Sequence, residues 1–145
     1  MAATSTSTAI TLRGSTDIVV EFFEYSVNSI LYQRGIYPPE SFQKASKYGL
    51  TTMITADESL KGYISNITRQ LETWLMNNAV KKLVLVVKGV ETGDTLERWV
   101  FECVTNNNIN STTGDKIEKP MKEITSEIQA IMRQITASVT FLPLL

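Results

Sequence analysis

A continuous apolar run from Leu83 to Val87 constrains the fold of this chain more than any other feature. Five consecutive leucine and valine residues are typical of a β-strand that is covered on both faces, or nearly so. Thr92-Gly93-Asp94 then supplies turn chemistry, and Leu96 to Val104 returns as a second strand. Together these segments predict a β-hairpin and therefore an antiparallel sheet.

Three other segments carry apolar residues at helical spacing. The first is predicted to begin at an N-cap on Ser15, with Asp17 in its first turn, and to end near Gly35. The second follows Thr55-Ala56-Asp57-Glu58, which matches the capping-box pattern. Its predicted core stripe consists of Leu60, Tyr63, Ile64, Ile67, Leu71, Trp74 and Leu75.

The third predicted helix begins near Glu118, with Pro120 in its first turn. Its predicted core face consists of Met121, Ile124, Ile128, Ile131, Met132 and Ile135. We expect a loop over GIYPPESF, a short strand between Tyr48 and Ile54, a polar loop from Thr105 to Gly114 and a final strand from Val139 to Leu145. This order predicts an α+β fold, with helices packed on an antiparallel sheet.

Composition narrows the possible functions. The 145 residues predict one domain behind a flexible Ser/Thr-rich tail over residues 1–9. The net charge is −1 and the basic residues are scattered, so neither a nucleic acid nor a membrane is expected as a partner. The chain has no histidine and one cysteine, Cys103, which removes the commonest general base and any multi-cysteine zinc site. We therefore expect no enzyme, no cofactor and no metal.

Three stretches are more specific than any periodicity. They read ITLRGSTDIVVEFFEYSVNSILYQRGIYP (Ile10 to Pro38), LERWVFE (Leu96 to Glu102) and IMRQITASVTFLPLL (Ile131 to Leu145). Together they resemble the spindle assembly checkpoint branch of the HORMA-domain family, the group named after the second mitotic-arrest-deficient protein. The resemblance covers residues 10–145, which we predict to form one HORMA domain.

The resemblance implies a binding protein with three helices packed on an antiparallel sheet. Members of this group add a short extended segment of a partner to a sheet edge, and a mobile C-terminal segment, the safety belt, closes over it. The implied partners are a coiled-coil kinetochore scaffold, the activator subunit of the anaphase-promoting complex, whose capture delays anaphase, and another HORMA copy in an open–closed dimer. The implied locations are the nucleus, the kinetochore and the cytoplasm.

The same resemblance assigns candidate site residues. Dimerisation contacts are expected at the exposed end of the third helix, just after it, and at the end of the first helix. The matching positions are Arg133, Gln134, Thr140, Phe141 and Arg34. Trp74 matches a tryptophan near the peptide pocket, and Leu12 matches a position that influences the open–closed balance. Periodicity alone leaves Arg133 and Gln134 as an ordinary solvated pair, and Trp74 as a plain core residue.

The segment SVTFLPLL, Ser138 to Leu145, is followed in this group by another strand and then by the safety belt. We expect both of those elements to be missing here, so the final strand should present an uncovered apolar edge that invites pairing with another chain. Fewer buried contacts then predict a low stability for a chain of this length. We also expect that belt-like trapping of a partner peptide is lost.

Two alternatives remain open. One is another HORMA branch, such as a translesion-polymerase subunit or a meiotic axis protein, which shares the architecture but uses other partners. The other is a truncated regulator that docks on partners through Arg133 and Gln134 but cannot trap a peptide. A panel of partner peptides distinguishes the first alternative, and a test for lost checkpoint arrest on overexpression distinguishes the second.

Overall fold

The computed structural model describes residues 6–47, 49–77, 80–105 and 121–142. In chain order the elements are β1 (Thr6–Gly14), α1 (Thr16–Gln33), the 3₁₀ helix η1 (Pro39–Ser41), β2 (Phe42–Lys47), β3 (Leu50–Thr55), α2 (Glu58–Met76), β4 (Lys82–Lys88), β5 (Thr95–Thr105) and α3 (Met121–Phe141). The three predicted helices and the β4–β5 hairpin are confirmed. The predicted helix start at Glu118 and most of the polar loop after Thr105 lie outside the described residues.

The strands form two separate sheets. One has the order β1-β5-β4, and the other is the β2–β3 hairpin. β4 pairs with β5 in antiparallel register, whereas β1 pairs with β5 in parallel, from Thr6 opposite Glu97 to Gly14 opposite Thr105. The expectation of a purely antiparallel sheet is therefore wrong for β1. A parallel pair needs a long crossover, and the two helices and the β2–β3 hairpin between β1 and β5 provide it.

The N-terminal boundary also needs correction. A flexible tail was expected over residues 1–9, but β1 begins at Thr6, so the second half of that segment pairs with β5. Residues 1–5 lie outside the described part of the chain. β1 is hard to recognise from the sequence because Ile10 and Leu12 alone show the alternation of large apolar residues that marks a strand. Both side chains are buried.

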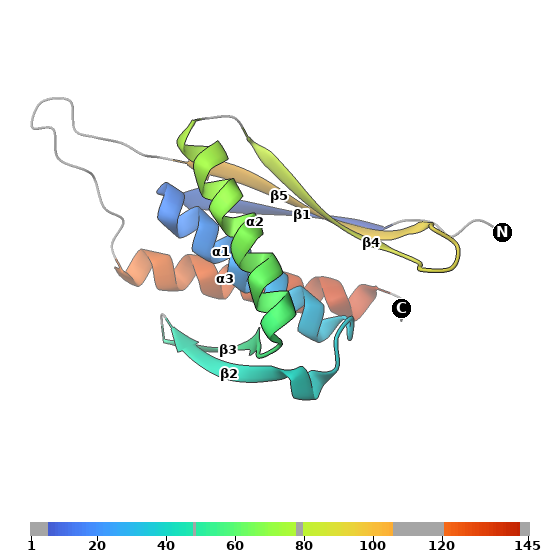
Figure 1. The fold of residues 1–145 in the computed structure, drawn as a ribbon. Coiled ribbons are helices and arrows are strands. Elements are labelled where there is room, and N and C mark those ends of the chain that lie inside the picture. The colour runs from blue at the N-terminus through green and yellow to red at the C-terminus, as the bar shows by residue number, and fades with distance from the viewer. Residues whose placement is uncertain (1–5, 48, 78–79, 106–120, 143–145) are drawn as a thin grey trace, which may run out of the picture.

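The helices occupy the middle of the molecule. Figure 1 shows α1, α2 and α3 between the β1-β5-β4 sheet on one side and the β2–β3 hairpin on the other. The sheet therefore has one covered face and one open face. On β5 the side chains of Trp99, Phe101 and Cys103 point into the core, while Arg98 and Val104 on the alternate positions are exposed.

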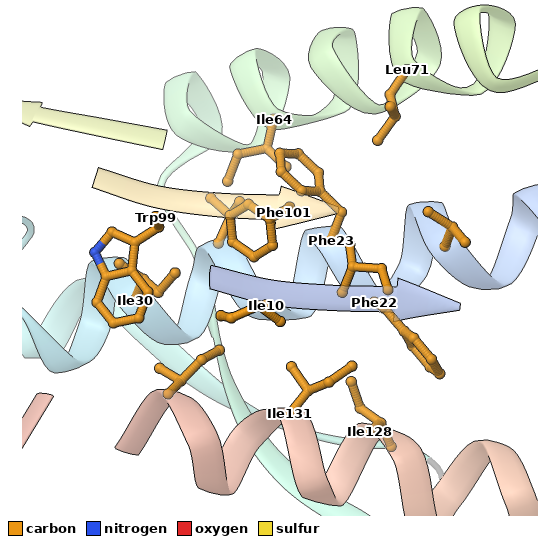
Figure 2. Packing of buried hydrophobic residues seen from close by; sticks show 14 of the residues in the cluster. Ile10, Phe22, Phe23, Ile30, Ile64, Leu71, Trp99, Phe101, Ile128 and Ile131 are labelled. Carbon is orange, nitrogen blue, oxygen red and sulfur yellow. The ribbon is translucent and has the colours of Figure 1, made fainter. Parts of the chain in front are cut away.

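One continuous core joins all three helices to the covered face of the sheet. Phe23 of α1 meets Phe101 of β5 edge to face, with ring centroids 5.2 Å apart. Figure 2 shows Ile128 and Ile131 of α3 reaching toward β1, while Ile64 of α2 approaches the aromatic pair from the opposite side. The predicted core face of α3 is confirmed at Ile124, Ile128, Ile131 and Ile135.

Helix caps fix where α1 begins and ends. The Ser15 hydroxyl accepts a hydrogen bond from the Ile18 amide at 3.4 Å, which confirms the predicted N-cap. At the other end Gly35 has a φ of +65°. The Ile36 amide donates to the Leu31 carbonyl at 3.1 Å and the Gly35 amide donates to the Tyr32 carbonyl at 3.2 Å. These two bonds form a Schellman motif, which reverses the chain at the helix end.

The start of α2 differs from the capping-box prediction. The N-cap is Asp57, whose carboxylate accepts a hydrogen bond from the Leu60 amide at 3.0 Å. Thr55 is instead buried, and its hydroxyl accepts a hydrogen bond from the Asp57 amide at 3.1 Å. Thr55 is the last residue of β3 and pairs with Phe42 in the β2–β3 hairpin. The helix therefore begins two residues later, where Asp57 caps it.

Three further expectations are wrong. β4 is exposed on alternate residues, with Val84 half exposed, because it is an edge strand with one solvated face. Tyr63 of the predicted α2 stripe is also exposed. The strand expected from Val139 is helical through Phe141, because Val139 and Leu142 continue the spacing of the α3 core face and pack on the core. Residues 143–145 lie outside the described part.

Candidate functional site

The outer edge of β4 is a free strand edge among the described residues. The Lys81 carbonyl accepts a hydrogen bond from the Cys103 amide at 2.8 Å. In the β4–β5 register, the residues an even number of positions from Lys81 therefore direct their backbone groups toward β5. In an antiparallel pair, neighbouring residues direct their backbone groups to opposite sides. The amide and carbonyl groups of Val84 and Val86 therefore point away from β5, where they are able to receive an added strand.

An apolar groove of about 460 Å³ lies beside this edge. Its walls come from α1, α2, β4 and the turn after α1. It is lined by Phe23, Val27, Leu31, Ile36, Tyr37, Leu60, Tyr63, Ile64, Ile67 and residues 83–88. A row of free backbone groups next to an apolar groove is the arrangement that binds an extended peptide by strand addition.

Trp74, the candidate pocket residue, lies on α2 beyond the groove. Its side chain is 43% exposed, so it is not a plain core residue. Trp74 follows Ile67 by seven residues, two helical turns, and therefore shares its side of the helix. The structure thus places Trp74 in line with the groove wall but not among the groove's lining residues.

The candidate dimerisation residues of α3 form one exposed stripe. Arg133 and Thr140 are seven residues apart, as are Gln134 and Phe141, so the four residues share one side of the helix. Within the described part of the chain, Arg133 donates from Nε to the Gln129 carbonyl of its own helix at 3.4 Å. The Phe141 side chain is 87% exposed. Exposed phenylalanine and arginine side chains on one face of a helix are typical of a protein interface.

Gln134 has a second role that the sequence did not indicate. Its side-chain Nε2 donates to the Ala9 carbonyl of β1 at 2.7 Å. Among the described strands β1 pairs with β5 alone, and this bond to α3 adds a second attachment. The exposed stripe of α3 is thereby tied directly to the N-terminal strand.

Arg34 and Leu12 are placed in the interior. Arg34 forms an ion pair with Glu97 of β5, with 2.8 Å between Nη2 and Oε2, and its side chain is only 4% exposed. Leu12 is fully buried in β1 opposite Cys103. The structure therefore does not bring Arg34 to the exposed stripe of α3, and its contact role stays a prediction, as does the role of Leu12 in the open–closed balance.

Glu97 was missed by the sequence analysis, although a signal was available. It occupies the same alternation as Trp99, Phe101 and Cys103, the inward-facing positions of β5. An acidic residue in the buried alternation of a strand requires a cationic or hydrogen-bonding partner. Glu97 has both, because Arg34 donates to it and the Trp99 indole Nε1 donates to its Oε1 at 3.0 Å.

The described residues show no sign of metal or membrane chemistry. They contain no group of three or more acidic, cysteine or histidine side chains placed to hold a metal ion. None of their helices is long and apolar enough to cross a membrane. Burial raises the pKa of the Cys103 thiol to about 11, which keeps this side chain protonated and unreactive at neutral pH.

Comparison with known proteins assigns the fold to a family. Residues 15–145 match the HORMA domain family model, and this chain belongs to the HORMA-domain family. Within it the chain is 56% identical over 144 residues to mitotic spindle assembly checkpoint protein MAD2A of Dictyostelium discoideum, covering 99% of this chain and 70% of that protein. It is 50% identical over 136 residues to human MAD2A, covering 94% of this chain and 66% of that protein.

A solved structure agrees with this assignment. A chain in the crystal structure of the mitotic checkpoint complex superimposes with a TM-score of 0.75 at 44% sequence identity, over 90% of this chain and 66% of that chain. The resemblance drawn from three sequence stretches is thereby confirmed. This chain spans about two thirds of the length of these relatives.

Proposed function

We propose that this chain is a peptide-binding adaptor of the spindle assembly checkpoint. It captures a short extended segment of the activator subunit of the anaphase-promoting complex, or of a coiled-coil kinetochore scaffold, and so delays anaphase. The observation that carries this proposal is the free edge of β4 beside an apolar groove of about 460 Å³. The relatives are named as mitotic spindle assembly checkpoint proteins, which supports partners from that checkpoint.

The groove favours an apolar segment, because apolar side chains predominate among its lining residues. The side of α2 that faces it carries Tyr63, Ile67 and, further along, Trp74, none of which is charged. β4 contributes Leu83, Leu85 and Val87 on its half-buried alternation. A bound strand therefore gains main-chain hydrogen bonds from the β4 edge and buries alternate side chains against α2.

A fluorescence anisotropy titration tests this function. A labelled synthetic peptide from the activator subunit is titrated with the chain, and saturable binding is the expected result. Val86→Pro removes one outward-facing amide donor of β4 and should weaken binding, whereas Val104→Thr, on the open face of β5, should leave it unchanged. Absence of saturable binding by the unaltered chain would overturn the proposal.

The stripe on α3 supports a second interaction, docking on another HORMA copy. Arg133, Thr140 and Phe141 are exposed there, and the hydrogen bonds of the Arg133 and Thr140 side chains stay within α3. Arg133→Glu combined with Gln134→Ala should weaken docking to a closed full-length relative, because it reverses the charge that Arg133 brings to the stripe. Unchanged co-elution in gel filtration would count against this interface. The nucleus, the kinetochore and the cytoplasm are the locations that this function implies.

A further inference from the structure

The ion pair between α1 and β5 is the most strongly bonded polar group in the described core. Arg34 Nε donates to both carboxylate oxygens of Glu97, at 3.0 and 3.1 Å, and Nη2 donates to Oε2 at 2.8 Å. Both side chains are at most 4% exposed. The buried Trp99 indole adds a fourth hydrogen bond, to Oε1 of Glu97 at 3.0 Å. We call these three residues the Arg34–Glu97–Trp99 network.

The network joins the two walls at one end of the apolar groove. On one side Arg34 is the C-cap of α1, and the Schellman turn that follows it places Ile36 and Tyr37 in the groove lining. On the other side Glu97 lies opposite Val87 in the β4–β5 register, and Val87 lines the same groove. One residue, Gly35, separates Arg34 from Ile36 in one wall, and Glu97 is the direct cross-strand partner of Val87 in the other.

We propose that the Arg34–Glu97–Trp99 network sets the width of this end of the groove, so that Arg34 is a positioning residue for peptide binding and not an exposed docking contact. The inference rests on the proposed peptide-binding function. An ion pair with several directed hydrogen bonds fixes one relative placement of two elements, whereas apolar side chains tolerate several placements.

Burial argues against a direct docking role for Arg34. A partner has to break the bonds to Glu97 before it contacts the guanidinium, because the side chain is 4% exposed. That step leaves a buried carboxylate without its cation, which is among the costliest changes in a protein interior. The exposed stripe of α3 offers Arg133 at no such cost.

Two variants separate positioning from docking. Glu97→Gln removes the charge but keeps an oxygen for the Trp99 indole, and it should weaken binding of the labelled activator peptide roughly tenfold, within the range of coupling between contacting residues. The double variant Arg34→Met with Glu97→Leu replaces the pair by apolar side chains, a change that proteins tolerate. It should weaken peptide binding by a similar factor, while gel-filtration docking through α3 stays unchanged in both variants.

A stability-matched control excludes a general loss of structure. Asn28→Ser removes the side-chain carbonyl that accepts a hydrogen bond from the Thr55 amide at 3.0 Å, at a site that does not line the groove. All variants are compared well below their own melting temperatures, and Asn28→Ser should keep its peptide affinity within about twofold. Hydrogen exchange at the Ile36 amide, which bonds to the Leu31 carbonyl, should accelerate in Glu97→Gln and not in Asn28→Ser.

The outcomes are distinguishable. No binding by the unaltered chain overturns the proposed function and this inference with it. Binding by the unaltered chain that both network variants leave within twofold overturns the inference alone. Peptide affinity that falls equally in Asn28→Ser also overturns it, because the effect would then follow stability. Weakened docking in the double variant but not in Glu97→Gln returns Arg34 to the docking surface.

Discussion

At the scale of single residues, two glycines of this chain respond in opposite ways to the same substitution. Gly14 has a φ of +145°, and an added Cβ would lie 2.8 Å from the Ile18 side chain. Gly62 lies inside α2 with open space around it. Gly14→Ala should lower the free energy of unfolding by about 2 kcal/mol, whereas Gly62→Ala should raise it by about 1 kcal/mol. Urea denaturation of both variants checks the pair, and equal signs would contradict it.

The buried thiol gives a pH dependence at the same scale. Because burial raises the pKa of Cys103 to about 11, above its ordinary value of 9.0, the folded state holds this proton more tightly than the unfolded state. The resulting stability is complete below pH 9 and is lost as the pH rises from 9 toward 11. Melting temperatures measured over this range should fall more steeply for the unaltered chain than for Cys103→Ala, and parallel curves would exclude the thiol as the cause.

At the scale of elements, the N-cap of α2 belongs to Asp57 and not to Thr55. Asp57→Ala should therefore lower the free energy of unfolding by about 1 kcal/mol, since the Leu60 amide loses its acceptor. Asp57→Asn keeps an acceptor oxygen and should change the stability by a few tenths of a kcal/mol. Chemical denaturation followed by circular dichroism measures both, and a loss in Asp57→Asn as large as in Asp57→Ala would contradict the assignment.

Local patterns were sufficient for the elements whose signals are local. Helical spacing located α1, α2 and α3, and two apolar runs around a turn located the β4–β5 hairpin. The end of α3 was misjudged because Val139 and Phe141 favour strands by composition. Ile135, Val139 and Leu142 instead continue the helical spacing onto the core, and tertiary packing prevailed over local preference.

The site was only partly accessible to sequence reasoning. The exposed stripe of α3 follows from spacing, because Arg133 and Gln134 fall off the apolar face. The groove does not, because it forms where α1, α2 and β4 meet, and no local pattern reports which strand is at the edge. The pairing of Arg34 with Glu97 spans 63 positions of sequence, so only the inward alternation of Glu97 hints at it.

At the scale of the whole molecule, β1 is an edge strand that α3 helps to hold in place. Among the described strands it pairs with β5 alone, and Gln134 supplies a hydrogen bond to its Ala9 carbonyl. Gln134→Ala should accelerate hydrogen exchange in β1 while the amides of α2 keep their protection, because the freed Ala9 carbonyl reaches solvent at little global cost. Arg133→Ala, which loses only a bond within α3, is the control. Equal exchange in both variants would contradict a role for Gln134 in holding β1.

The parallel pairing of β1 with β5 also sets an order of events on the ribosome. The first residue of β1, Thr6, finds its partner in Glu97, and the last, Gly14, in Thr105. At translation rates of about 5–20 residues per second, some 5–20 s separate the synthesis of the two strands. Throughout that interval Ile10 and Leu12 have no sheet to cover them. A nascent chain of this protein thus presents its N-terminal strand to chaperones until the middle of the sheet has been made.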